Sequence, residues 1–247
     1  MLNKPRTKGY YMIDFHAHIL PNIDDGAENA EVSLNMLKIS AEQGVDCLVA
    51  APHFYPDEES LKSFLERRAK AFHSLIERCN AEENFKMPKI KLGAEVYWFK
   101  GMSNAENLDK LAIQNTQCLL VEPPMAKWNE DLIEDIESIG VKQKLVPVIA
   151  HADRYARMLE DYSLFDNLSR HRVLIQTNAS FFIYDECRKK ALELLAEGRI
   201  HFIGSDCHNA DNRRPNIGDA AKIAAEAGLA KQFAQITVNS KRVLEGN

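Results

Sequence analysis

Short apolar runs rich in β-branched residues recur along the whole chain. They span residues 12–16, 46–51, 90–96, 117–122, 145–151, 172–177 and 200–205 and predict strands. Apolar residues between them recur at helical spacing, over residues 61–79 and 132–139. Strand and helix therefore alternate, which predicts a single α/β domain of parallel βα units. Seven such strands favour a barrel or a large open sheet, and the periodicity does not distinguish the two.

Polar side chains stand at the carboxyl ends of these runs. They are His16, His18, His53, Glu95, Glu122, His151, Asp206 and His208. In parallel α/β folds the loops at that end converge on the active site, so residues far apart in sequence meet there. The sequence therefore predicts a metal-binding cluster.

Two pairs of residues share one spacing within this set. On an extended backbone the imidazoles of His16 and His18 point the same way and can hold one cation. Asp206 and His208 repeat the spacing after the last strand. The alternative is a pair of structural histidines bonded to backbone carbonyls.

The acidic candidates each have a second interpretation. Asp25 follows the first strand, but an Asp-Gly pair is also a common turn, and Asp24 could be the functional residue instead. Glu95 and Glu122 lie at the ends of apolar strands, where an uncompensated carboxylate costs several kcal/mol, roughly, to bury. Metal binding or salt bridges would compensate them.

Arginines follow two of the candidate ligands. Arg154 comes three residues after His151, and Arg213 and Arg214 come soon after His208. Planar guanidinium groups beside a metal cluster would clamp phosphate oxygens. Surface salt bridges are the alternative, most of all for Arg214.

Aromatic residues also lie close after the candidate ligands. Tyr55, Tyr97, Trp98 and Tyr155 could wall an aromatic substrate pocket, and packing in the core or at its rim is the alternative. The remaining histidines, His73, His171 and His201, match no cluster, so we expect structural or surface roles for them.

The stretch CHNADNR, from Cys207 to Arg213, has the bare spacing of thiolate-dependent tyrosine phosphatases. That loop needs backbone N–H groups that cradle phosphate, usually in a glycine-rich run, and no glycine is present here. We interpret the match as accidental, although it supplies a rival mechanism.

Composition narrows the possible partners. The 247 residues carry a net charge of −5, which weighs against a sequence-independent nucleic-acid binder. No membrane-length apolar run is present, so we expect no membrane insertion. Five cysteines without paired spacing predict a cytoplasmic protein. Residues 1–11 are basic and unpatterned; we expect a peripheral arm or a natural start at Met12, with one domain over residues 12–247.

The motifs together resemble the polymerase and histidinol phosphatase (PHP) superfamily, and within it the bacterial manganese-dependent tyrosine-protein phosphatases of capsular and exopolysaccharide gene clusters. The motifs are IDFHAHILPNIDDG, APHFYP, GAEVY, LLVE, VIAHADRY and GSDCHN, in family order from residue 13 to about 215. The resemblance implies a distorted (β/α)7 TIM-like barrel, the PHP fold, with three divalent metal ions. Manganese is expected, and iron or zinc would suit the same donors.

The resemblance also implies how the metals are held. His16, His18, Glu95 and Asp206 would hold one, and Glu95 would bridge to a second that Glu122 and His151 also bind. Asp25, His53 and His208 would hold the third. Four carboxylates against three divalent cations leave a net charge of +2, enough to attract a phosphate dianion.

The implied activity is hydrolysis of phosphotyrosine by a metal-bound hydroxide, with Arg154 and Arg213 stabilising the phosphoryl oxygens. The implied substrate is a protein, such as the C-terminal tail of a bacterial tyrosine kinase that controls polysaccharide export. The alternative is a small-metabolite phosphatase, for example for histidinol phosphate. A nuclease is disfavoured by the negative charge, and a non-catalytic scaffold by the retention of all nine candidate ligands. The sequence leaves the oligomeric state open.

Overall fold

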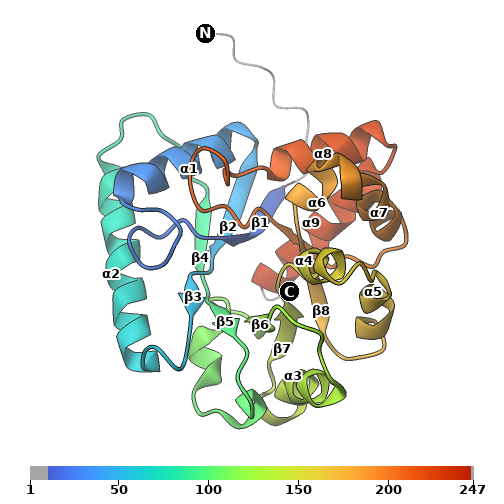
Figure 1. Cartoon of the computed structure of the whole chain (residues 1–247). Coiled ribbons are helices and arrows are strands. Elements are labelled where there is room, and N and C mark those ends of the chain that lie inside the picture. Colours follow the sequence, from blue (N-terminus) through green and yellow to red (C-terminus); the bar gives the residue numbers. More distant parts are fainter. Residues whose placement is uncertain (1–10, 246–247) are drawn as a thin grey trace.

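Parallel strands, each followed by a helix or a turn, make up the chain in the computed structural model, which describes residues 11–245 (Figure 1). The strands are β1 (Met12–Ala17), β2 (Val45–Ala50), β3 (His53–Phe54), β4 (Lys89–Leu92), β5 (Glu95–Tyr97), β6 (Cys118–Glu122), β7 (Val146–Ile149), β8 (Leu174–Asn178) and β9 (Phe202–Gly204). The helices are α1 (Ala30–Glu42), α2 (Leu61–Asn80), α3 (Glu130–Gln143), α4 (Ala152–Met158), α5 (Ser163–Leu168), α6 (Ser180–Ile183), α7 (Asp185–Ala196), α8 (Ile217–Glu226) and α9 (Ala230–Glu245). The predicted α/β domain is confirmed.

The strands form two hydrogen-bonded sheets, in the orders β1-β2-β4 and β3-β5-β6-β7-β8-β9, and every ladder is parallel. The division falls at the end of one predicted strand and inside another. The predicted strand 46–51 is found as β2, which ends before Pro52, a residue with no N–H for a ladder. The predicted strand 90–96 is divided at Gly93 and Ala94 into β4 and β5. The carbonyl of Pro52 accepts from Glu95 N at 3.0 Å, so the two sheets remain joined at the break.

The last strand lies beside the first. Ala17 forms an isolated parallel bridge with Cys207, just beyond β9. Two backbone hydrogen bonds reinforce this contact, from His18 N to Cys207 O at 3.0 Å and from Asp206 N to His16 O at 2.8 Å. The sheet is therefore strongly curled, and the ends of β1 and β9 are brought together.

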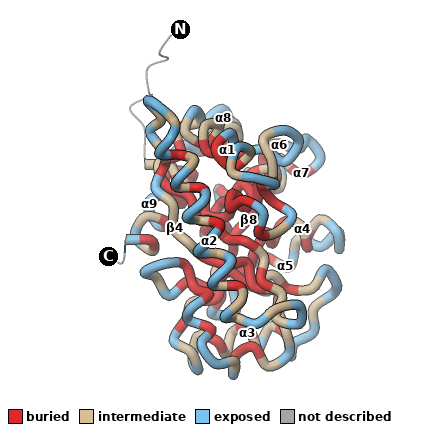
Figure 2. Tube along the Cα trace, turned by 90° about the vertical axis from the view of Figure 1, so that its left-hand side faces the viewer, coloured by how far each residue is buried: buried red, intermediate tan, exposed pale blue. Residues whose placement is uncertain are grey.

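Alternate side chains from the strands fill the inside of the curl. Phe15 of β1 and Phe202 of β9 stack at a centroid distance of 3.9 Å, and Val49, Leu120 and Val148 pack in the same cluster. Figure 2 shows the buried residues along the strands and the exposed residues on the outer helices. This apolar layer lies below the polar side chains at the strand ends and supports them.

The two predicted helical stripes are confirmed as buried faces. On α2, Phe64, Leu75 and Cys79 are buried, and the Ser60 hydroxyl caps the helix by accepting from Ser63 N. On α3, the stripe of residues 132–139 likewise faces the core. The alternation fails at three places in the described chain. No helix separates β2 from β3 or β4 from β5, and between β5 and β6 there are only the 3-10 turns Met102–Asn104 and Leu108–Leu111.

The expected peripheral arm falls almost wholly on residues 1–10, which lie outside the described residues. Tyr11 is the exception, and the Lys241 ammonium lies 4.9 Å from the centre of its ring. In residues 11–245, no helix has both the length and the apolar character needed to span a membrane.

Candidate metal centre

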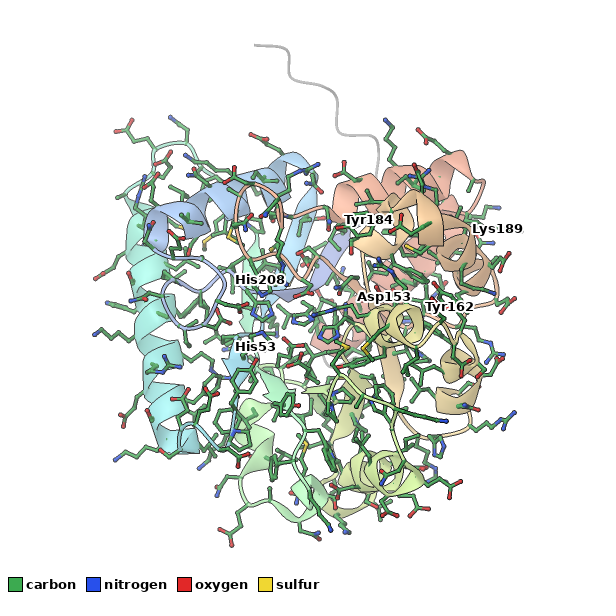
Figure 3. All side chains as sticks on the ribbon, in the orientation of Figure 1. His53, Asp153, Tyr162, Tyr184, Lys189 and His208 are labelled. Atoms are coloured by element: carbon green, nitrogen blue, oxygen red, sulfur yellow. The ribbon has the colours of Figure 1, made fainter. Side chains whose placement is uncertain are left out.

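The structure brings all nine predicted ligand side chains together at the carboxyl ends of the strands. These side chains are His16, His18, Asp25, His53, Glu95, Glu122, His151, Asp206 and His208. Figure 3 labels two of them, His53 and His208, whose ring centres are 6.2 Å apart. The location that these side chains share is the one the sequence predicted. That they bind metal stays a prediction.

Glu95, on β5, is the centre of the cluster. Its Oε1 atom lies 2.7 Å from His151 Nε2, and its Oε2 atom lies 3.1 Å from His16 Nε2 and 3.2 Å from His18 Nε2. His53 Nδ1 lies 3.2 Å from the same Oε2. One fully buried carboxylate therefore faces four imidazoles. The two Nε2 atoms of the His-x-His pair are 3.0 Å apart, as expected for side chains on one face of a strand.

Asp25 closes the cluster on its solvent side. Its carboxylate is 64% exposed, and Oδ1 lies 3.3 Å from His208 Nε2 and 3.5 Å from His53 Nε2. The rings of His18 and His208 stack behind it at 4.1 Å. The cluster is thus open at Asp25 and buried at Glu95.

The donor atoms form three overlapping sets, and within each set they lie within 4.8 Å of one another. The sets are His18, Asp25, His53 and His208; His16, His18 and Glu95; and His53, Glu95 and Glu122. The first contains the whole of the implied third site. His151 and Asp206 fall outside these sets but border them, with Asp206 Oδ1 3.6 Å from His18 Nε2.

The cluster fits divalent cations by two further observations. Among the described residues, four of its buried atoms lack a hydrogen-bond partner: His53 Nδ1, Glu122 Oε2, His151 Nδ1 and His208 Nε2. Buried polar atoms are normally paired, so these atoms are suited to a ligand. Imidazole nitrogens and carboxylate oxygens together suit manganese, iron or zinc.

Electrostatics keeps the carboxylates charged. Burial opposes ionisation of Asp206, but His16, His151 and His18 outweigh it and hold its pKa at about 2. Burial would likewise raise the pKa of Glu95, but His16 and His151 outweigh it and hold this pKa well below its usual range. Both residues are therefore anionic donors at neutral pH.

Two histidines of the cluster, His208 and His151, have pKa values shifted in opposite directions. Burial and the neighbouring His18 lower the pKa of His208 to about 4, so its ring is neutral at physiological pH. Burial would also lower the pKa of His151, but Glu95 and Glu122 raise it to about 10. A metal that binds His151 would have to displace that proton, which couples metal affinity to pH.

An outer layer of polar residues orients the imidazoles. Asp24 Oδ2 lies 2.8 Å from His18 Nδ1, and the Asp24 carboxylate also accepts from Gly26 N and His53 N. The sequence left Asp24 and Asp25 as alternatives. The structure gives them different places, with Asp25 at the donor set and Asp24 behind His18, where such a carboxylate fixes the ring.

Two amides on β8 complete this layer, and the sequence analysis missed both. Gln176 Oε1 accepts from His151 N at 2.7 Å and lies 3.3 Å from His16 Nδ1. Asn178 Nδ2 donates to Asp206 Oδ2 at 2.8 Å. Both lie at the carboxyl end of a predicted strand, so the rule that found the ligands could have found them.

Two glycines let the backbone approach the His-x-His pair. A Cβ atom on Gly204 would lie 2.5 Å from His16 Cβ, and one on Gly26 would lie 2.4 Å from His18 O. No side chain fits at either position without displacing a histidine of the cluster.

Two of the three candidate arginines reach the cluster. Arg154 Nη1 lies 3.6 Å from Asp206 Oδ2, and Arg213 Nη2 lies 3.3 Å from Asp206 Oδ1. Both side chains are partly exposed, so their guanidinium groups border the open side. Arg214 instead pairs with Asp219 at 2.8 Å, which makes it a surface salt bridge.

Of the four aromatic candidates, two border the cluster and two do not. Tyr155 is fully buried and its hydroxyl donates to Pro123 O, while the Trp98 indole donates to Asp135. These two have structural roles. Tyr55 stacks on His53 at 5.3 Å, and Tyr97 lies 5.6 Å from Tyr55, so both border the cluster.

The structure disfavours the rival cysteine mechanism. Cys207 is 1% exposed, and burial raises the pKa of its thiol well above the usual range. A nucleophilic cysteine must be an accessible thiolate. The histidines expected outside the site are indeed elsewhere: His73 pairs with Glu77, and His171 with Glu137.

Comparison of the sequence with known proteins finds a matching family and relatives named as tyrosine phosphatases. The family described as "Capsular polysaccharide synthesis, CpsB/CapC" matches residues 12–245. The chain is 27% identical to the tyrosine-protein phosphatase CpsB of Streptococcus agalactiae serotype V over 227 residues, which cover 86% of this chain and 89% of the relative. It is also 27% identical to the tyrosine-protein phosphatase YwqE of Bacillus subtilis over 232 residues, which cover 90% of this chain and 85% of YwqE.

A solved structure shares the fold. It comes from work on YwqE from Bacillus subtilis and CpsB from Streptococcus pneumoniae, described as unique metal-dependent tyrosine phosphatases. The TM-score is 0.80, with 23% sequence identity over 95% of this chain and 94% of the other. The resemblance drawn from the motifs is confirmed, and the chain belongs to the CpsB/CapC family of capsular polysaccharide synthesis.

Proposed function

We propose that this chain is a metal-dependent protein-tyrosine phosphatase, a phosphoric monoester hydrolase. The observation that carries the proposal is the meeting of nine imidazole and carboxylate donors with two arginines at one open rim. The names of the relatives favour this function over a small-metabolite phosphatase. We further propose that the curled sheet is a distorted (β/α)7 barrel, supported by the contact of β1 with the segment after β9.

The residues that would hold the metals are the nine donors, in the three sites that the family resemblance implies. The overlap of the three donor sets supports closely spaced ions, and manganese is the proposed metal. Divalent cations bound there would act as Lewis acids and lower the pKa of a bound water.

The chain itself would bind and orient the phosphoryl group. Arg154 and Arg213 now point to the carboxylate of Asp206, and either can turn its planar fork toward phosphate oxygens instead. Tyr55, stacked on His53, would pack against the phenyl ring of phosphotyrosine. A phenol with a pKa of about 10 leaves more readily than an alkyl alcohol, so strong general-acid assistance is less necessary.

The proposed substrate is a phosphotyrosine protein, such as the C-terminal tail of a bacterial tyrosine kinase that regulates polysaccharide export. The family description, which concerns capsular polysaccharide synthesis, supports this choice. The proposed compartment is the cytoplasm, because all five cysteines are free and buried.

The test is hydrolysis of a phosphotyrosine peptide before and after chelation, with manganese added back, for the wild type and Cys207→Ser. We expect activity that chelation abolishes, that manganese restores and that Cys207→Ser retains. Activity that resists chelation but disappears in Cys207→Ser would contradict the proposal. Histidinol phosphate as a competing substrate separates the metabolite phosphatase, which would prefer it to the peptide.

A further inference from the structure

A cleft of about 730 Å³ opens beside the metal centre. One wall is the loop after β6, where Met125 lies three residues beyond Glu122. A second wall is α4, where Arg154 lies three residues beyond His151, and Glu186 and Cys187 of α7 complete the lining. The first two walls continue from strands that lead to candidate ligands, and Arg154 borders both the cleft and the metal centre.

The cleft gathers exposed apolar side chains. Met125 is 43% exposed and Met158 is 45% exposed, and both line it. Tyr184, 46% exposed, lies at its edge beside Arg157. Large apolar side chains seldom gather on a protein surface without a ligand or partner, so this concentration indicates a binding surface. Figure 3 shows Tyr162 and Tyr184 around α4, to the right of His53 and His208.

The charges in the cleft do not favour a second anion. Arg157 is held 3.4 Å from Glu186, and its guanidinium lies 5.4 Å from the centre of the Tyr184 ring. Glu160 lines the cleft as well. The charge of Arg157 is therefore compensated by carboxylates. The part of the cleft that remains available to a ligand is the apolar surface of Met125 and Met158. Methionine adapts its shape to varied apolar partners.

We propose that this cleft binds the substrate polypeptide next to the phosphotyrosine, through an apolar side chain seated between Met125 and Met158. The inference rests on the proposed phosphatase function and deepens it. Arg154 and Met158 are four residues apart, about 6 Å along α4. An extended peptide advances about 3.3 Å per residue, so the apolar side chain lies within about three residues of the phosphotyrosine.

The test compares two phosphotyrosine peptides that differ only in carrying leucines or serines in the three residues on each side of the phosphotyrosine. A small aryl phosphate, p-nitrophenyl phosphate, reports on the metal centre alone. The variant is Met125→Gln with Met158→Gln, which removes the apolar surface at nearly constant volume. The control is Val141→Gln, which changes a 74% exposed apolar residue on α3 outside the cleft.

With manganese present, the wild type and Val141→Gln should hydrolyse the leucine peptide with about tenfold higher kcat/KM than the serine peptide, as expected for apolar contacts of this size. The double variant should lose this preference through a raised KM and keep its activity on the aryl phosphate. Equal preference in the wild type and the double variant would overturn the inference. So would a loss on the aryl phosphate equal to that on the peptide, because the defect would then be in the metal centre.

Light scattering on the same proteins tests a second copy of the chain as the occupant. A wild-type oligomer that dissociates in the double variant, with the peptide preference unchanged, would assign the cleft to self-association and overturn the inference. A wild type that hydrolyses neither peptide nor aryl phosphate would refute the proposed function and, with it, this inference. Aryl phosphatase activity without a peptide preference would refute the cleft alone.

Discussion

Replacement of Glu95 by glutamine tests the centre of the cluster most directly. The substitution keeps the shape of the side chain and removes the charge that lies within 3.2 Å of four imidazole nitrogens. The carboxylate belongs to two of the three donor sets, so its loss should weaken more than one metal site at once. We therefore expect a large loss of metal affinity with little change in packing.

The size of the expected effect follows from the coupling between metal binding and folding. Loss of a residue that only orients a metal ligand lowers affinity about 10- to 100-fold, so we expect at least about 100-fold for a shared carboxylate. At a manganese concentration 100 times the wild-type Kd, one bound ion stabilises the folded state by about 2.7 kcal/mol, and a 100-fold weaker site retains only about 0.4 kcal/mol. For a chain of this length each kcal/mol is about 2–4 °C in Tm, so Glu95→Gln should lose about 5–9 °C of the manganese-induced shift.

The assay is thermal unfolding of chelator-treated protein across a manganese titration, with bound metal measured in parallel. Glu137→Gln is the matched control, because Glu137 pairs with His171 outside the cluster and its loss should leave the manganese shift unchanged. A manganese-induced shift in Glu95→Gln equal to that of the wild type would show that Glu95 binds no metal, and that the four imidazoles only surround a salt-bridged carboxylate.

Three further substitutions test the neighbouring layers. Arg213→Ala should lower kcat/KM for aryl phosphates about 10- to 100-fold with metal content intact, whereas Arg214→Ala should not, and equal effects of the two would refute the assignment. Burial raises the pKa of Asp153 to about 6, so the folded state loses stability as pH rises from about 4 to 6. In urea unfolding, the free energy of unfolding of Asp153→Asn relative to the wild type should therefore be about 1–2 kcal/mol higher at pH 8 than at pH 5. A difference between variant and wild type that does not change with pH would contradict this. Gly204→Ala should destabilise the folded state by about 1–3 kcal/mol, because the new Cβ would lie 2.5 Å from His16 Cβ. Gly140→Ala, on α3 with no neighbour closer than 3.5 Å, should stabilise it by up to about 1 kcal/mol. Similar unfolding midpoints for the two variants would disprove the close contact at Gly204.

Local pattern was enough to predict the elements and the members of the cluster. The apolar runs predicted the strands because a strand buried on both faces is apolar over its length, and the helical stripes predicted α2 and α3 because one face of each helix is buried. The polar residues that end the strands predicted the site, since all parallel strands end at one edge. This rule placed His16 and His208 together although 191 residues lie between them.

Tertiary structure alone decided which donor faces which. The spacing of the sequence does not contain the curl of the sheet, and it is the curl that brings β1 beside the segment after β9 and sets Glu95 among four imidazoles. The roles of Asp24 and Asp25 follow from the path of one loop across the sheet, and the place of Gln176 from the register of β8 beside β7. The cleft beside Arg154 has the same origin, because three segments that are separate in sequence line it. Sequence periodicity reports the environment of each residue, whereas distances between strands depend on register and twist, which are properties of the assembled sheet.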